Sequence, residues 1–179
     1  MALVGLRKRE IDLALVHSYT VLPRDFPPGC EETKLLDDPV LLALHPDRAS
    51  RLGLATGRPA DLAAFADAPW LAPAPVASCY EMIQRACGAA GFVPRIRARS
   101  SDFSVLTALA AADAGVALVP RLALPESAAA LSLHPLVRPV TRTVFTAART
   151  GTARRPGIRH LRGLLHEAAD ALPSGPQLP

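Results

Sequence analysis

The stretch Ser100–Leu124, which reads SSDFSVLTALAAADAGVALVPRLAL, predicts the fold of this 179-residue chain. Ser101 or Asp102 can cap the start of a helix, and apolar residues then recur at helical spacing. Gly115 follows the last helical residue, where a left-handed helix end favours glycine. The short apolar run Val116–Val119, which a proline stops, is typical of a buried strand. The sequence therefore predicts a helix that leads directly into a buried strand.

The residues before this helix complete a parallel β-α-β unit. Arg95–Arg99 alternates polar and apolar residues, as a strand with one covered face does. Further upstream, Ser78 and Glu81 have the spacing of a capping box, which predicts a helix that runs through Ala90. The segment Leu35–Leu44 is also strand-like, with an expected interruption at its proline. Strands that alternate with helices in this way indicate an α/β fold.

Two proline-rich connectors, near 71–77 and 121–131, bracket this block. A chain that leaves one lobe, builds a second and returns forms a two-lobed fold, which can close on a ligand by hinge motion. We expect lobe one to comprise 1–71 and 127–172 and lobe two to comprise 72–126. Residues 173–179 read as a polar, disordered tail.

The composition excludes several classes of protein. Half of the residues are apolar, so most of the chain is not disordered, yet no apolar run is long enough for a membrane span. The net charge of +4 comes almost wholly from dispersed arginines, and aromatic residues make up 4% of the chain, so direct DNA binding is not expected. No signal peptide opens the sequence, which favours a cytoplasmic protein that does not bind a membrane.

Five phrases, in the same order along the chain, resemble the effector-binding domain of LysR-type transcriptional regulators. They lie at Leu6–Val16, at Asp37–Pro46, at Asp61–Leu71, at Gly91–Pro94 and at Ala114–Pro120. The resemblance implies a two-lobed, type 2 periplasmic-binding-protein-like α/β fold that lacks the first β-α-β of lobe one. It also implies a small-molecule effector, homo-oligomers of the full-length regulator, and DNA binding only through an N-terminal winged helix-turn-helix absent from this chain.

In that family the ligand lies between the lobes near helix starts, whose free N–H groups favour anions. The resemblance therefore implies ligand contacts at Ser78 and at Ser101, Asp102 and Phe103, although ordinary capping explains Ser78 and Asp102 equally well. The negative charge of Asp102 would oppose an anion, so its backbone would have to serve.

Three further positions are candidates for ligand contact. Ala77 would line the hinge between the lobes, and Pro120 would lie where the chain returns to lobe one. Both residues could equally have only a structural role. His17 follows the strand-like IDLALV stretch, where it could carry a positive charge below a pKa of about 6.5 or lie solvated in a loop.

Nothing in the sequence indicates catalysis. Glycine-rich phosphate loops and nucleophile or zinc-protease motifs are absent, the three cysteines have no metal-ligand spacing, and the histidines lie apart. We therefore expect no enzyme activity, no metal and no cofactor. The alternatives are a solute-binding protein of a transport system, which shares this architecture, and an enzyme built on the same scaffold.

Overall fold

The structure is a computed structural model, and it describes residues 2–172. These residues form two compact units: 2–37 with 142–172, and 38–141. The predicted disordered tail, 173–179, lies outside the described residues. Among the described helices, none is long and apolar enough to cross a membrane.

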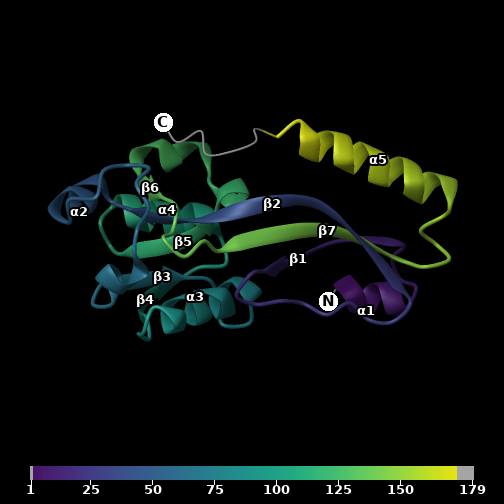
Figure 1. Ribbon diagram of the computed structural model, residues 1–179, viewed down its shortest axis with the longest axis horizontal. Coiled ribbons are helices and arrows are strands. Elements are labelled where there is room, and N and C mark those ends of the chain that lie inside the picture. Colours follow the sequence, from purple (N-terminus) through teal and green to yellow (C-terminus); the bar gives the residue numbers. More distant parts are fainter. Residues whose placement is uncertain (1, 173–179) are drawn as a thin grey trace. The chain divides into compact units, whose positions relative to one another are not determined.

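The unit 38–141 is built on a mixed sheet with the strand order β6-β2-β5-β3-β4 (Figure 1). Strand β3 pairs in parallel with both β4 and β5, whereas β2 pairs antiparallel with β5 and β6. The strands are β2 (Cys30–Leu44), β3 (Pro69–Ala72), β4 (Arg95–Arg99), β5 (Val116–Pro120) and β6 (Ser132–His134). The helical elements are α2 (Pro46–Arg51), η1 (Leu62–Phe65), α3 (Ser78–Ala89), α4 (Phe103–Ala111), η2 (Arg121–Ala123) and η3 (Glu126–Ala130).

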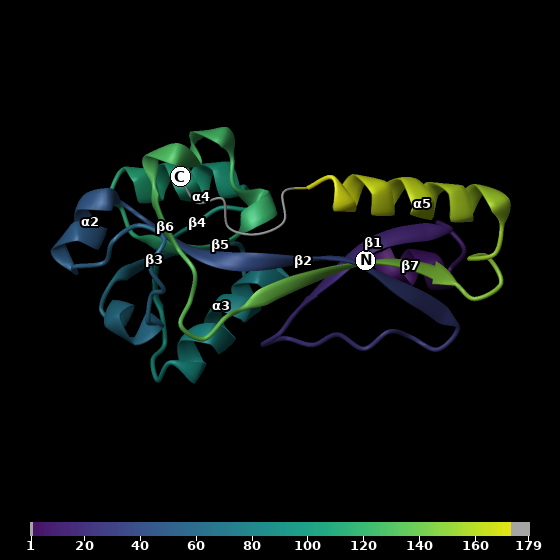
Figure 2. The ribbon, with the colours of Figure 1, turned by 45° about the horizontal axis from the view of Figure 1, so that its top comes forward.

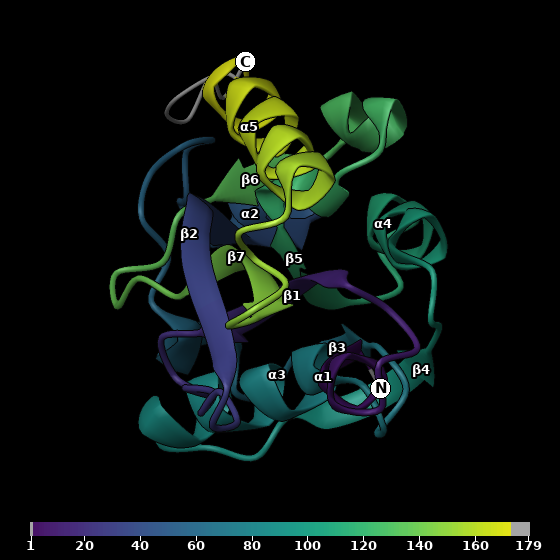
Figure 3. The ribbon, with the colours of Figure 1, turned by 90° about the vertical axis from the view of Figure 1, so that its right-hand side faces the viewer.

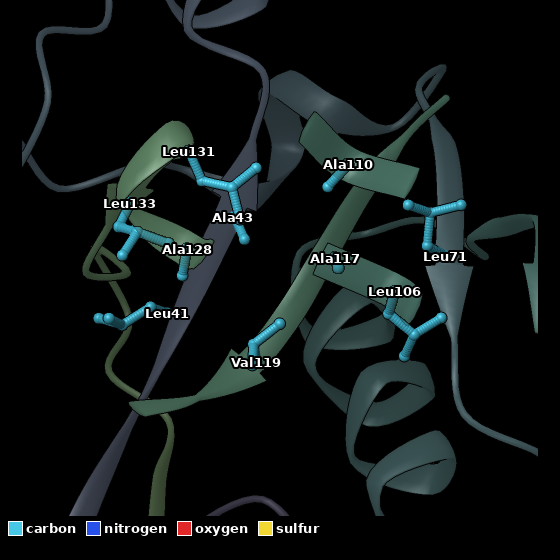
Figure 4. Packing of buried hydrophobic residues seen from close by; sticks show 10 residues of the cluster. All are labelled: Leu41, Ala43, Leu71, Leu106, Ala110, Ala117, Val119, Ala128, Leu131 and Leu133. Carbon is cyan, nitrogen blue, oxygen red and sulfur yellow. The ribbon is translucent and has the colours of Figure 1, made fainter. Parts of the chain in front are cut away.

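The predicted β-α-β unit is present as β4, α4 and β5. All five residues of β5 are buried, because helices cover both faces of the sheet at this strand. Figure 2 shows α4 and α3 on opposite sides of the strands. On the α4 side, Leu106 and Ala110 pack with Leu71, Ala117 and Val119 in one apolar cluster (Figure 4). Burial of these apolar side chains makes the main contribution to the stability of the unit.

The predicted role of Gly115 is wrong. The left-handed residue after α4 is Asp113, with a φ of 55°, and Gly115 instead sits against the neighbouring strand. A Cβ atom on Gly115 would lie 2.5 Å from the carbonyl oxygen of Pro69. Glycine is needed here because the backbone entering β5 approaches β3 closely.

The expected interruption of β2 at Pro39 is also wrong, because β2 runs without a break for 15 residues. The ladder between β2 and β5 begins at Val40, opposite Pro120. Pro39 therefore precedes the first paired residue, where a missing N–H group removes no bond of this ladder.

The unit 2–37 with 142–172 contains β1 (Leu13–Tyr19), β7 (Thr141–Arg149) and the first half of β2, with β7 between the other two strands. Its helices, α1 (Ala2–Arg7) and α5 (Pro156–Asp170), lie on opposite sides of β1 and β7 (Figure 3). Leu6, Ala14, Val16 and Ala147 form its buried cluster. No side chain of α5 is buried.

The two units differ in their bounds from the predicted lobes. The chain passes from one unit to the other at Asp37–Asp38, inside β2, and returns at Thr141–Arg142, at the start of β7. A continuous strand carries each passage, whereas the sequence placed the passages in the proline-rich connectors. The ranges 1–71 with 127–172 and 72–126 stay a prediction for the lobes.

Candidate functional site

The carboxyl ends of β3, β4 and β5 form one edge of the sheet in the unit 38–141, and we call it the carboxyl edge. Because Ala72 pairs with Arg99 in the parallel β3–β4 ladder, α3 and α4 start from adjacent strand ends. The chain moves from β3 to β4 on one side, then crosses back to β5 on the other side of β3. In α/β sheets, ligands bind at the carboxyl ends of strands where successive connections diverge in this way.

At the start of α3, Ala77 is the N-cap, and no side chain caps the helix there. The predicted capping box is wrong, because Ser78 is already the first helical residue. Glu81 accepts a hydrogen bond of 2.8 Å from Arg85 instead of reaching back to the helix start. Because alanine has no polar side chain, the partial positive charge of this helix end is not offset by the N-cap residue.

At the start of α4, Asp102 is the N-cap, as one of the two predicted possibilities. Its carboxylate accepts a hydrogen bond of 2.8 Å from the backbone N–H of Ser104. The backbone and side-chain hydrogen bonds with Ser104 lower the pKa of Asp102, so this carboxyl group is ionised near neutral pH. Ser101 is exposed beside it, whereas Phe103 is half-buried and packs against the apolar cluster of the unit.

Arg99 also lies at this edge. It ends β4, and its guanidinium carbon lies 5.9 Å from the ring centre of Tyr80, in the first turn of α3. Such a cation–π contact holds the positive charge near the two helix starts. The alternation of Arg95, Arg97 and Arg99 favours a solvated strand face, with an anion-lined cleft wall as the alternative. It does not distinguish Arg99 from the other two, whereas the β3–β4 register does.

Pro120 ends β5 and is buried, so its surroundings are those of a structural residue. The buried carboxylate of Asp38, on β2, accepts a hydrogen bond of 3.0 Å from the N–H of Leu122, just after Pro120. The start of η2 is therefore capped by a negative group. The start of α4 has a negative group as well, the carboxylate of Asp102.

His17 lies in the other unit, within β1 and half-buried rather than in a solvated loop. Burial, then the charges of Arg142 and Arg24, lower its pKa, so the imidazole is neutral near pH 7. The possibility that His17 supplies positive charge at this pH is therefore not supported. The two arginines carry that charge, and the Nε of Arg24 also donates a hydrogen bond of 2.9 Å to the carbonyl oxygen of His17.

The described residues contain no cluster of three or more His, Cys, Asp or Glu side chains that could hold a metal ion. Burial raises the pKa of Cys87 to about 12, so this thiol is protonated and is a packing residue of α3. The carboxyl edge brings together two helix starts, hydroxyl groups, the Arg99 guanidinium group and the Asp102 carboxylate. Helix starts and an arginine side chain are groups that interact favourably with negative charge.

Comparison with known proteins shows which family the chain resembles. A model of the LysR substrate binding domain matches residues 2–170. A solved structure of the Synechocystis PCC6803 CcmR regulatory domain in complex with 2-PG has a TM-score of 0.75 at 13% identity, over 96% of this chain and 79% of that one. The BenM effector binding domain with its effector benzoate has a TM-score of 0.69 at 20% identity, over 97% and 77% of the two chains.

A mutant of Corynebacterium glutamicum OxyR has a TM-score of 0.73 at 23% identity and covers 94% of this chain. The present chain spans only 51% of that OxyR chain. The comparison with proteins of curated function found no match. These likenesses confirm the predicted type 2 periplasmic-binding-like fold, and the family model covers nearly the whole described sequence: the chain belongs to the LysR substrate binding domain family.

Proposed function

We propose that this chain is the effector-sensing domain of a LysR-type transcriptional regulator and that it binds a small, negatively charged effector at the carboxyl edge. The observation that carries the proposal is the pairing of Ala72 with Arg99. This register brings two helix starts and one guanidinium group to the same edge of the sheet. Backbone N–H groups and an arginine together suit a carboxylate.

The chemistry of the effectors named for two relatives supports an anionic ligand. BenM is described with benzoate, which is a carboxylate, and CcmR with 2-PG. In our proposal the effector contacts the helix starts at Ser78 and at Ser101–Phe103, where the N–H of Asp102 already donates to the Ser100 hydroxyl, and Ala77 lies beside it as the N-cap of α3. Contributions from Pro120 and His17 stay predictions, and the buried Pro120 and the neutral His17 give them little support.

Effector binding regulates transcription only if it favours one conformation of the domain over another. We propose that it does so in the cytoplasm, in an oligomeric regulator whose winged helix-turn-helix contacts DNA. The family consists of regulators rather than enzymes, and no positive feature of the described residues indicates turnover. Hinge closure of the two units is the conformational change we propose.

The test is binding of benzoate and a panel of small mono- and dicarboxylates to the purified chain, by thermal shift and then by calorimetry. We expect at least one acid to bind saturably, and Arg99→Gln to weaken its binding by about tenfold, the size of a lost charge-assisted hydrogen bond. Arg97→Gln is the matched control, because it removes the same charge from an exposed residue of the same strand. Absence of binding by every acid, or an equal loss in both variants, contradicts the proposal.

A further inference from the structure

A second cationic site lies in the unit 2–37 with 142–172, and it does not depend on the proposed effector site. Residues from the turn after α1, the end of β7 and the turn before α5 line a cavity of about 350 Å³. We call it the arginine cavity, and its lining residues are Arg9, Arg149, Gly151, Thr152 and Arg155. This volume lies in the range of small-molecule sites and suits a compact ligand.

The arginine cavity has an excess of positive charge. Three guanidinium groups line it, and Asp12 is an acidic residue that pairs with two of them. Asp12 forms an ion pair with Arg149 and a longer contact of 3.8 Å with Arg155, whereas no ion pair of the Arg9 side chain is found within the described chain. Three positive charges against one negative charge leave an excess of two.

One of the three arginines is fixed in place by the fold. The Nη1 of Arg149 donates to the carbonyl oxygens of Leu6, at 2.8 Å, and Ile11, at 2.7 Å, while its Nη2 contacts Asp12. Only 19% of this side chain is exposed. The β1–β7 register explains the ion pair, because Leu13 faces Ala148 and the next residues outward are Asp12 and Arg149.

The other two arginines are exposed and available to a ligand. Arg155 is the N-cap of the 15-residue helix α5, which no side chain caps, so the positive end of that helix begins at the cavity. Arg9 follows α1 in the left-handed conformation, with a φ of 62°, which turns the chain at this point. A fixed cation, two adaptable cations and a helix start therefore converge on one cavity.

We propose that the arginine cavity binds a small ligand that carries a phosphate or diphosphate group. An oxyanion with two negative charges matches the excess of two positive charges, and guanidinium groups bind phosphate oxygens through paired hydrogen bonds. The cavity is separate from the region of His17. Leu13, next to Asp12, and His17 are four positions apart in β1, a distance of about 13 Å along a strand.

The experiment is calorimetric titration of the purified 179-residue chain with inorganic phosphate and pyrophosphate at about 0.15 M salt, where non-specific charge effects are screened. The variants are Arg9→Gln, Arg155→Gln and the double substitution, all at exposed side chains. Arg149 is left intact because its guanidinium group holds two backbone carbonyls. Arg154→Gln is the matched control, since it removes the same charge from the exposed neighbour of Arg155 that does not line the cavity.

We expect saturable binding of pyrophosphate, weakened by about tenfold in each single variant and further in the double variant, with Arg154→Gln within about twofold of the original chain. Absence of saturable binding overturns the proposal, and so does an equal loss in Arg154→Gln. A short DNA duplex is a separate arm of the experiment. If the duplex binds more tightly than pyrophosphate and with the same dependence on Arg9 and Arg155, the site is for a nucleic-acid backbone and the small-ligand proposal is wrong.

Discussion

The Oδ1 of Asp113 lies 2.7 Å from the Nε of Arg48, which joins the residue after α4 to the helix α2 that begins at Pro46. Arg48 also donates to the backbone carbonyl of Asp113, at 3.2 Å, and Arg51 donates to its other carboxylate oxygen at the same distance. Asp113 has a φ of 55°, a conformation that Asp tolerates better than most residues. The backbone of Asp113 therefore turns the chain after α4, while its carboxylate anchors α2.

Replacement of Asp113 by Asn is expected to lower the free energy of unfolding by about 1 kcal/mol, the value of a partly exposed charged pair. Asp113→Ala should cost more, because alanine also disfavours the left-handed backbone. Chemical denaturation of the chain measures both changes. A value for Asp113→Ala no larger than that for Asp113→Asn would show that the backbone conformation contributes nothing.

The ion pair of Asp113 with Arg48 also makes the stability of the chain depend on pH in the acidic range. Burial raises the pKa of Asp113, but the hydrogen bonds and charges of Arg48 and then Arg51 outweigh it, so the pKa is lower than its ordinary value of 3.8. A carboxyl group with a lowered pKa in the folded state stabilises the fold above its unfolded pKa. That contribution should disappear as the pH falls below 3.8 and through the folded pKa. The loss of unfolding free energy over this pH range should be smaller in Asp113→Asn than in the original chain.

Gly115→Ala should destabilise the unit 38–141 by roughly 1–3 kcal/mol, the usual cost of forcing an extra carbon into a packed site. The new Cβ would lie 2.5 Å from the backbone oxygen of Pro69, which cannot move without shifting β3. Gly88→Ala is the matched control, because its Cβ would meet nothing within 4 Å inside α3. That substitution should stabilise the chain by about 0.5–1 kcal/mol, the helix propensity gained. Thermal denaturation that moves both variants in the same direction would contradict this explanation.

Local patterns in the sequence were sufficient for the elements around the carboxyl edge. The alternation of Arg95–Arg99 and the apolar run after Gly115 predicted β4 and β5, because strand periodicity and burial leave a direct trace in residue order. The resemblance to one family then predicted the overall architecture, and the match over residues 2–170 confirmed it.

The sequence could not predict features that depend on partners distant along the chain. The close approach of Gly115 to Pro69 and the contact of Arg99 with Tyr80 follow from the strand order β5-β3-β4. For His17 the sequence left open a positive charge or a solvated loop position, and its burial with the charges of Arg142 and Arg24, which lower its pKa, follows from the fold. The arginine cavity likewise brings Arg9 together with Arg155, residues from opposite ends of the chain.

Because of His134, the stability of the unit 38–141 should decrease as the pH falls below about 6.5. Its ring is fully buried, with Nε2 at 2.8 Å from the hydroxyl of Ser132 and Nδ1 at 3.0 Å from the carbonyl oxygen of Arg58. Burial lowers the pKa of His134 from 6.5, and the hydrogen bond to Arg58 opposes this only in part. Below pH 6.5 the unfolded chain takes up a proton that the folded chain resists, so stability is lost as the pH falls toward the folded pKa.

The measurement is the free energy of unfolding between pH 7.5 and about pH 5, compared with that of His134→Gln. The glutamine variant starts from a lower stability, but its slope with pH should be smaller, because one histidine with a lowered pKa has been removed. His17, in the other unit, also has a lowered pKa and should leave a residual slope in the variant. An unchanged slope in His134→Gln would show that His134 does not titrate differently in the folded and unfolded states.

Helix α5 should be among the least protected helices of the described chain in hydrogen exchange. None of its side chains is buried, and Leu161 and Leu164 remain 43% and 47% exposed. By contrast, α4 buries Leu106, Thr107 and Ala110, although it is six residues shorter than the 15-residue α5. Helices gain most of their stability from packing rather than from length, so α5 should open locally without unfolding of the rest. Peptides from 156–170 should therefore exchange their amide protons faster than peptides from 103–111 at the same pH and temperature. Equal protection of the two helices would mean that α5 is covered in solution by a surface of another molecule, and dilution of the sample should then restore the difference.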